Sequence, residues 1–192
     1  MAKRVFFSFH YQDVIDFRAN VVRNHWLTKP DRSDAGFFDA SIWESAKKIS
    51  DLAVKRLIND ALYNTSNTCV LIGTQTFTRR WVRYEIMKSF EKGNHLFGVH
   101  INQIKDKYGK TKTLGINPFG YLGVRFKTDG SCDSLWEWKE GKWVEFEDLK
   151  NCKLQWTAQA NLQGNFYTLD KLYSCYCWVK DDGYNNFSDW VR

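Results

Sequence analysis

The sequence predicts an α/β fold in which five parallel strands form a sheet flanked by helices. Two observations support this prediction. Short apolar runs alternate along the chain with segments of helical periodicity, and polar or glycine-containing stretches separate them. The 192 residues, of which 43% are hydrophobic and 17% aromatic, are enough to bury one core of this kind. We therefore expect one α/β domain with an appendage, and right-handed crossovers between its strands.

Five apolar runs are expected to form the strands. The third, TCVLIG, is uniformly apolar, which is typical of a central parallel strand. Counted along the chain, a doubly wound sheet of five strands has the expected order 2-1-3-4-5, so the order reverses between the first and third strands. The runs lie at residues 4–9, 36–40, 68–73, 96–101 and 121–126.

Three segments between these runs have apolar residues at helical spacing. The first covers residues 14–27. The second continues to about Leu62 from Ser50, whose side chain can cap the first turn. The third covers about residues 79–92, and Gly93 is expected to end it. These helices are expected to flank the sheet.

The last part of the chain has a different composition. Residues 127–192 contain six of the nine tryptophans. The stretch LWEWKEGKWVEF alternates apolar and polar residues on both sides of Glu140 and Gly141, which predicts a β-hairpin. We expect residues 1–126 to form the α/β domain, and residues 127–192 to form a mostly β, tryptophan-rich extension packed on it.

The net charge of +6 favours anionic partners such as nucleotides, nucleic acids or acidic protein surfaces. The basic residues are scattered, and an aromatic-rich β surface is more often a small core than a base-stacking platform, so nucleic acid is the less favoured alternative. The five cysteines have no CxxC spacing, which predicts thiols in a reducing cytoplasm and no metal site. No apolar run approaches the length of a membrane span, so no membrane contact is expected.

Topology alone places a ligand site near Glu85. In a doubly wound sheet, ligands bind beyond the carboxyl ends of the strands, where the strand order reverses. Residues 8–13 follow the first strand to this point, and residues 74–80 follow the third strand and lead into the helix that carries Glu85. We therefore expect Glu85 to lie near a cleft.

The phase of this helix gives Glu85 a border position. Val82, Ile86 and Phe90 form a stripe that must face the sheet. Glu85 lies about 100° from the centre of that stripe, and Trp81 lies one turn earlier on the same side. Such a residue is either a solvated helix charge or a functional carboxylate, and the helix pattern leaves both alternatives open.

Two motifs, in the right order, resemble parts of TIR domains. KRVFFSFHYQD resembles the first strand of a TIR domain, which ends in Phe-x-Ser-Tyr or a similar sequence followed by Asp. NTCVLIGTQTFTRRWVRYEIMKSFEKGNHLFGVHI resembles the TIR segment with a Trp-x-x-x-Glu spacing, here Trp81 and Glu85. The resemblance covers about residues 3–126 and implies a flavodoxin-like TIR fold. More narrowly, the whole chain is similar to the TIR-like subunits of bacterial Thoeris antiphage systems.

This resemblance implies an enzyme that acts on NAD+. Enzymatic TIR domains cleave the bond between nicotinamide and ribose, and their catalytic glutamate occupies the position of Glu85. Thoeris TIR subunits respond to phage infection and convert NAD+ into a cyclic ADP-ribose isomer, a diffusible signal that activates a partner effector. The resemblance thus implies NAD+ as a substrate with no separate cofactor, a phage-derived trigger, and self-association.

The resemblance also indicates which residues border the nucleotide cleft. Ser8 is a candidate donor to a phosphate or ribose, and Phe9 either stacks on the ligand or packs internally. His10 is either an ordinary loop histidine or a proton-transfer group. The expected substrate-binding residues are Ser8, Phe9, His10, Asp39, Trp43, Trp81 and Tyr84, and the expected catalytic residue is Glu85.

Three alternatives remain open at this point: a non-catalytic TIR scaffold that acts by assembly, another flavodoxin-like N-glycosidic enzyme such as a nucleoside deoxyribosyltransferase, and a nucleic-acid-binding protein. A scaffold needs no carboxylate at position 85, and substrate choice separates the two enzymes. The stretch TKPDRSDAGFF lacks the Arg-Asp-x-x-Pro-Gly loop through which many TIR domains self-associate. The resemblance therefore implies no particular assembly geometry.

Overall fold

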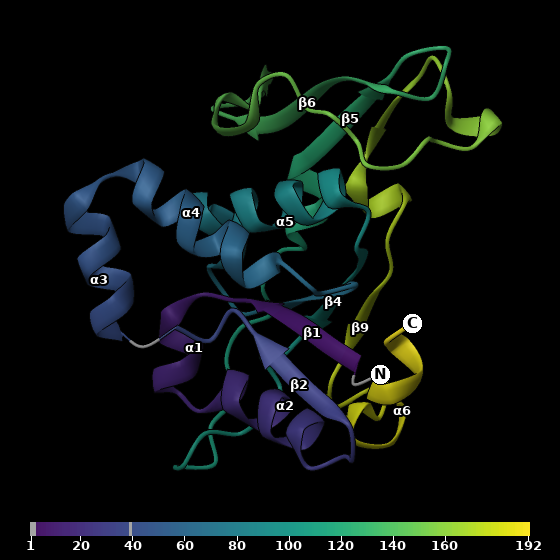
Figure 1. Ribbon diagram of the computed structural model, residues 1–192. Coiled ribbons are helices and arrows are strands. Elements are labelled where there is room, and N and C mark those ends of the chain that lie inside the picture. Colours follow the sequence, from purple (N-terminus) through teal and green to yellow (C-terminus); the bar gives the residue numbers. More distant parts are fainter. Residues whose placement is uncertain (1–2, 39) are drawn as a thin grey trace.

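The computed structural model describes residues 3–38 and 40–192, which form two sheets (Figure 1). The first sheet is all-parallel, in the order β2-β1-β3-β4-β9, which confirms the α/β fold with a five-stranded parallel sheet. Its strands are β1 (Lys3–Ser8), β2 (Arg32–Ala35), β3 (Asn67–Ile72), β4 (His95–His100) and β9 (Cys175–Cys177). The second sheet is antiparallel, in the order β7-β6-β5-β8, with β5 (Leu122–Phe126), β6 (Cys132–Lys139), β7 (Lys142–Glu145) and β8 (Phe166–Thr168).

Helices cover both faces of the parallel sheet. α2 (Arg18–Leu27) and α6 (Gly183–Trp190) pack on one face, and α4 (Asp51–Leu62) and α5 (Arg80–Lys92) cover the other, where α5 lies between the two sheets (Figure 1). Successive residues of β1 enter different cores, because side chains alternate along a strand: Phe6 belongs to the α4 and α5 side and Phe7 to the α2 and α6 side. The shorter elements are α1 (Tyr11–Ile15), α3 (Ala40–Ile49), and the 3₁₀ turns η1 (Thr76–Thr78), η2 (Pro118–Tyr121), η3 (Glu147–Leu149), η4 (Ala160–Leu162) and η5 (Leu169–Lys171).

The fifth strand of the parallel sheet is not the predicted one. The run at residues 121–126 is expected beside the fourth strand, but it forms β5, which pairs antiparallel with β6 and β8. A short turn joins β5 to β6, so this pairing closes a much smaller loop than a parallel crossover. The edge of β4 is instead filled by β9, a strand of three residues. Both sheets contain strands from each side of residue 126, and the division into domains there stays a prediction.

The second strand lies earlier than predicted. It is expected at residues 36–40 but is found at Arg32–Ala35, in parallel register with residues 3–6 of β1. Gly36 follows it with a φ of 90°, a left-handed conformation that favours glycine. A Cβ atom on Gly36 would lie 2.3 Å from the carbonyl oxygen of Phe7, so this close turn against β1 requires glycine.

The first predicted helix is interrupted at Phe17, whose φ of 63° separates α1 from α2.

Three other predictions about these elements are confirmed. The Oγ of Ser50 caps α4 by accepting a hydrogen bond of 3.1 Å from the backbone N–H of Ala53. Gly93 ends α5 with a φ of 85°, and the predicted hairpin is formed by β6 and β7, with positive φ at both turn residues.

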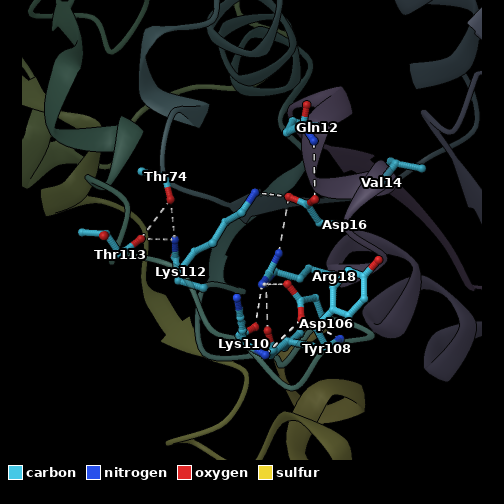
Figure 2. Close-up of polar contacts among 12 residues, drawn as sticks. Gln12, Val14, Asp16, Arg18, Thr74, Asp106, Tyr108, Lys110, Lys112 and Thr113 are labelled. Carbon is cyan, nitrogen blue, oxygen red and sulfur yellow. Dashed lines mark hydrogen bonds and ion pairs between the residues drawn. The ribbon is translucent and has the colours of Figure 1, made fainter.

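The long loop after β4 is anchored to the first helices by a buried arginine (Figure 2). Arg18 is 1% exposed and donates to the carbonyl oxygen of Lys110 at 2.8 Å. Its guanidinium also pairs with Asp106 at 3.5 Å and with Asp16 at 3.4 Å, and Lys112 of the loop pairs with the same Asp16. A buried cation is stable only when it is paired in this way. The loop is therefore held beside the segment that follows β1.

No helix in residues 3–38 or 40–192 combines the length and the apolar character that a membrane crossing requires.

Candidate active site

A cavity of about 350 Å³ lies beyond the carboxyl end of β1, the strand at which the sheet order reverses. Three segments line it: the loop after β1, the stretch from the end of β2 into α3, and the start of α5. This is the place where topology predicts a ligand site. The lining residues are Phe9, His10, Tyr11, Gly36, Phe38, Trp43, Lys47, Arg79, Arg80, Trp81, Val82 and Glu85.

Among the described lining residues, Glu85 is the only one with a carboxyl group, and it is 6% exposed. The hydroxyl group of Ser8 donates a hydrogen bond of 2.5 Å to Oε2 of Glu85. Burial raises the pKa of Glu85 to about 8, and the hydrogen bond from Ser8 opposes part of this rise. The border position that helix phase predicts is therefore a buried position in the fold, because the end of β1 reaches this side of α5.

Two local features set the distance between Ser8 and Glu85. Ser8 is the last residue of β1, is fully buried, and pairs in register with Val70 of the central strand β3. After β3, the backbone N–H of Gly73 donates to the hydroxyl of Thr76 at 2.8 Å, which fixes the turn that leads into α5. Glu85 then lies in the second turn of α5 and faces the end of β1.

Aromatic rings and cations form most of the remaining lining. The rings of Phe38 and Trp43 stack with centroids 5.6 Å apart and an interplanar angle of 15°. The guanidinium carbon of Arg80 lies 4.6 Å from the ring centroid of Trp81. Burial and nearby cations lower the pKa of His10, so this ring is neutral at physiological pH. The cavity thus suits a ligand with aromatic rings and anionic groups, and Glu85 can stabilise positive charge in it.

The structure brings most of the predicted site residues together. Phe9, His10, Trp43, Trp81 and Glu85 line the cavity, and Ser8 is joined to Glu85 by a hydrogen bond. Tyr84 does not line it: its hydroxyl donates to Oδ1 of Asn59 on α4 at 3.1 Å, because neighbouring helix positions point about 100° apart. Asp39 lies outside the described residues. The roles of all these residues toward a ligand stay predictions.

Five aromatic or basic lining residues are absent from the predicted set: Tyr11, Phe38, Lys47, Arg79 and Arg80. Three of them belong to residues 8–13 and 74–80, the segments that topology brings to this point. The positions of Phe38 and Lys47 depend on where β2 ends and on α3. The sequence pattern predicts neither this end of β2 nor a helix at residues 40–49. The sequence could have indicated Lys47, because it follows the predicted site residue Trp43 by four residues and so lies on the same face of a helix. In the structure its Nζ lies 5.7 Å from the centroid of the Trp43 ring.

A second buried carboxylate lies nearby. Asp13 is 4% exposed, and burial raises its pKa to about 6 although Lys112 and other cations oppose this rise. Asp13 lines a neighbouring hollow of about 660 Å³ that shares His10 and Arg79 with the cavity. A Cβ atom on Gly73 would lie 2.3 Å from both carboxylate oxygens of Asp13. Asp13 therefore packs directly on the end of β3.

In the part of the chain that the structure describes, no three histidine, cysteine, aspartate or glutamate side chains are placed to share a metal ion.

The five-stranded parallel sheet, with a buried glutamate in the cavity where its order reverses, is the arrangement of a TIR-like α/β domain. The family "Thoeris protein ThsB, TIR-like domain" matches residues 6–106, and the chain belongs to this family. A protein of Bacillus cereus (strain MSX-D12) named "Putative cyclic ADP-D-ribose synthase ThsB1" is 64% identical over 192 residues, the full length of both chains. The resemblance to Thoeris TIR-like subunits is thereby confirmed.

Proposed function

We propose that the protein cleaves the bond between nicotinamide and ribose in NAD+ and closes the remaining ADP-ribose into a cyclic isomer. The observation that carries this proposal is the buried carboxyl group of Glu85, at the point where the sheet order reverses and between aromatic walls and cations. The name of the similar Bacillus cereus protein supports the cyclic product. The product is the diffusible signal that activates a partner effector during phage infection.

One carboxylate is sufficient for this cleavage. Most glycosidases need a second carboxyl group, which protonates the leaving group. Nicotinamide in NAD+ is already cationic. When the bond from ribose C1′ to the ring nitrogen breaks, its electron pair stays with that nitrogen and nicotinamide departs as a neutral molecule. The positive charge that develops on the ribose is stabilised by the ionised Glu85.

The substrate itself favours the ionised form of Glu85. Without a ligand, the pKa of about 8 keeps this carboxyl group mostly protonated at neutral pH. A nicotinamide cation in the cavity lowers that pKa, because a nearby opposite charge favours the charged form of an acid. The hydroxyl of Ser8, which donates to Oε2, supports the same form.

The other lining residues bind and orient the dinucleotide. The aromatic side chains of Phe9, Trp43 and Trp81 suit the nicotinamide and adenine rings, and Arg79 suits the pyrophosphate. Trp81 lies one turn before Glu85 and keeps water from it. A cavity that excludes water favours attack on C1′ by an adenine nitrogen or a ribose hydroxyl of the same molecule, which gives a cyclic product instead of a hydrolysed one. If a hydroxyl attacks, the carboxylate of Glu85 accepts its proton.

In this proposal NAD+ is the substrate, and the reaction requires no metal or further cofactor because the leaving group is already activated. The reaction takes place in the cytoplasm, where NAD+ is available and thiols stay reduced. A phage-derived trigger and self-association of the protein control it.

Cells that express the protein and are infected with phage are expected to accumulate a cyclic ADP-ribose isomer and nicotinamide. Targeted mass spectrometry of small molecules measures both, with and without infection. The same measurement on purified protein and NAD+ shows whether turnover requires the trigger. Absence of both products under every condition would contradict the enzymatic proposal and favour a scaffold that acts by assembly. Transfer of a nucleoside base would favour the deoxyribosyltransferase alternative.

Replacing Ser8 with alanine is expected to slow nicotinamide release about ten-fold at neutral pH, the effect of losing one hydrogen bond to a charged group. Without this donor the pKa of Glu85 rises further, so the increase of kcat/KM with pH moves to more alkaline values. Ser89→Ala is the matched control, because Ser89 is a buried serine on α5, the helix that carries Glu85, and its hydroxyl accepts a hydrogen bond of 2.9 Å from Thr68. An unchanged pH profile in Ser8→Ala would contradict the role of this bond.

A further inference from the structure

An ion pair connects the C-terminal part of the chain, residues 127–192, to the wall of the cavity. Asp148, in η3, accepts two hydrogen bonds of 2.7 Å from Arg80, one from Nε to Oδ2 and one from Nη2 to Oδ1. Arg80 is the first residue of α5, and its guanidinium lies over the ring of Trp81. A bidentate pair of this kind fixes the orientation of the guanidinium plane as well as its position.

Arg80 lines two neighbouring hollows of the molecule. It lines the cavity that contains Glu85, and it lines a groove of about 970 Å³ whose other side is formed by the second sheet and the segment after it. Asp148 lines only the groove. The pair of Asp148 and Arg80 therefore joins a residue outside the cavity to a residue of its wall.

Asp148 is the more firmly held partner of this pair. The ammonium group of Lys55 on α4 donates to its carbonyl oxygen at 2.8 Å and lies 3.0 Å from Oδ1. The side chain of Asp148 is 14% exposed, compared with 51% for Arg80. The hydrogen bonds from Arg80 lower the pKa of Asp148 to about 2, so its carboxylate is ionised at physiological pH. Asp148 is thus a fixed anion to which the more exposed Arg80 is attached.

We propose that Asp148 is a positioning residue of the active site, which holds Arg80 over Trp81 and so ties the cavity wall to the C-terminal part of the chain. The inference rests on the proposed function, in which Trp81 keeps water from Glu85. Without the charge of Asp148, Arg80 regains rotamer freedom and keeps only its second ion pair, to Asp51 at 2.7 Å. Trp81 then loses the cation that restrains it, and water reaches the cavity more easily.

A second contact between α5 and the C-terminal part provides the control. Arg83 pairs with Glu137 of β6 at 2.7 Å, and its Nε donates to the carbonyl oxygen of Phe77 at 2.9 Å. This contact joins α5 to the second sheet, but none of its residues lines the cavity. The substitution Glu137→Gln therefore weakens the packing of α5 without releasing Arg80.

The experiment compares Asp148→Asn, Asp148→Glu and Glu137→Gln with the wild type. In Asp148→Asn we expect the KM for NAD+ to rise about five-fold and the ratio of cyclic product to linear ADP-ribose to fall. The kcat for nicotinamide release stays close to that of the wild type, because Ser8 and Glu85 are unchanged. Asp148→Glu is expected to recover part of the ratio, and Glu137→Gln to keep it. A lower thermal stability of Asp148→Asn with unchanged KM and ratio would overturn the inference.

A measurement without turnover keeps this inference separate from the proposed function. The indole N–H signal of Trp81 in an NMR spectrum is identified by its loss in Trp81→Phe. It is expected to shift in Asp148→Asn and to stay in place in Glu137→Gln. If the signal does not move in Asp148→Asn, the tie between Asp148 and the cavity wall is refuted, whatever the activity. If it moves while the wild type releases no nicotinamide under any condition, the tie holds and the proposed function fails.

Discussion

Replacing Glu85 with glutamine is expected to lower nicotinamide release and cyclic product formation about 1,000-fold, the upper range for losing one group that stabilises charge in a transition state. Glutamine has nearly the shape of glutamate but cannot carry the negative charge that faces the ribose. Among the described lining residues there is no other carboxylate that could take over this role. Burst and steady-state measurements of nicotinamide release with saturating NAD+ quantify the loss.

The fold is expected to survive this substitution. The pKa of about 8 means that the native protein mostly contains a neutral Glu85 at neutral pH, and glutamine is neutral as well. The amide oxygen of glutamine can accept the hydrogen bond that Ser8 donates to Oε2. Circular dichroism should therefore resemble that of the wild type, and the midpoint temperature of unfolding should be no lower, which separates a catalytic loss from a folding defect.

Glu91→Gln is the matched control for this experiment. Glu91 lies on the same helix and is 8% exposed, and its carboxylate pairs with Lys88 and accepts a bond of 3.0 Å from the backbone N–H of Lys153. It does not line the cavity, so we expect its substitution to lower stability and leave kcat/KM close to that of the wild type. Equal product formation by Glu85→Gln and the wild type would refute the catalytic role of Glu85.

The predicted topology is correct where apolar runs are long and wrong where pairing depends on neighbours. β3 and β4 are buried on both faces, so their sequences are continuous apolar runs that identify them. β9 lies at the sheet edge and has only three residues, so it leaves no such run. The run that forms β5 is apolar for another reason, since Val124 and Phe126 enter the core that α5 shares with the second sheet. A local pattern cannot distinguish these two causes of burial.

The local sequence pattern predicts the candidate site only in part, for the same reason. Topology places Glu85 at the right end of the sheet, and the helix pattern places Trp81 on the same side of α5. The pattern does not show that Glu85 is buried, because the cover comes from Ser8, which is 77 residues away in the chain. Lys47 reaches the cavity from α3, and Phe38 from the stretch between β2 and α3, and the sequence pattern predicts no helix at residues 40–49. Of the lining residues that sequence reasoning missed, Phe38 and Lys47 are therefore the two that only tertiary packing brings to the cavity.

Glu85 is expected to make the free energy of unfolding fall as pH rises from about 4.5 to about 8. In the unfolded chain this carboxyl group has the ordinary pKa of 4.5, and in the native state its pKa is raised to about 8. Between these values the native state holds a proton that the unfolded state has lost, so each increase in pH favours unfolding. The midpoint temperature of Glu85→Gln should exceed that of the wild type by an amount that grows through this pH range. Because Asp13 and the histidines titrate equally in both proteins, the difference isolates Glu85.

The same pKa predicts an opposite trend for activity, and substrate binding makes that trend diagnostic. Catalysis requires the ionised carboxylate, so kcat/KM, which reports on the free enzyme, should rise with pH until about 8. In the complex, the nicotinamide cation lowers the pKa of Glu85, so kcat should reach its plateau at a lower pH than kcat/KM. Initial rates of nicotinamide release from about pH 5.5 to about pH 9.5 separate the two profiles. A kcat/KM that does not change over this range would mean that ionisation of Glu85 is not required, whereas coincident profiles would mean that the cationic ring does not bind beside it.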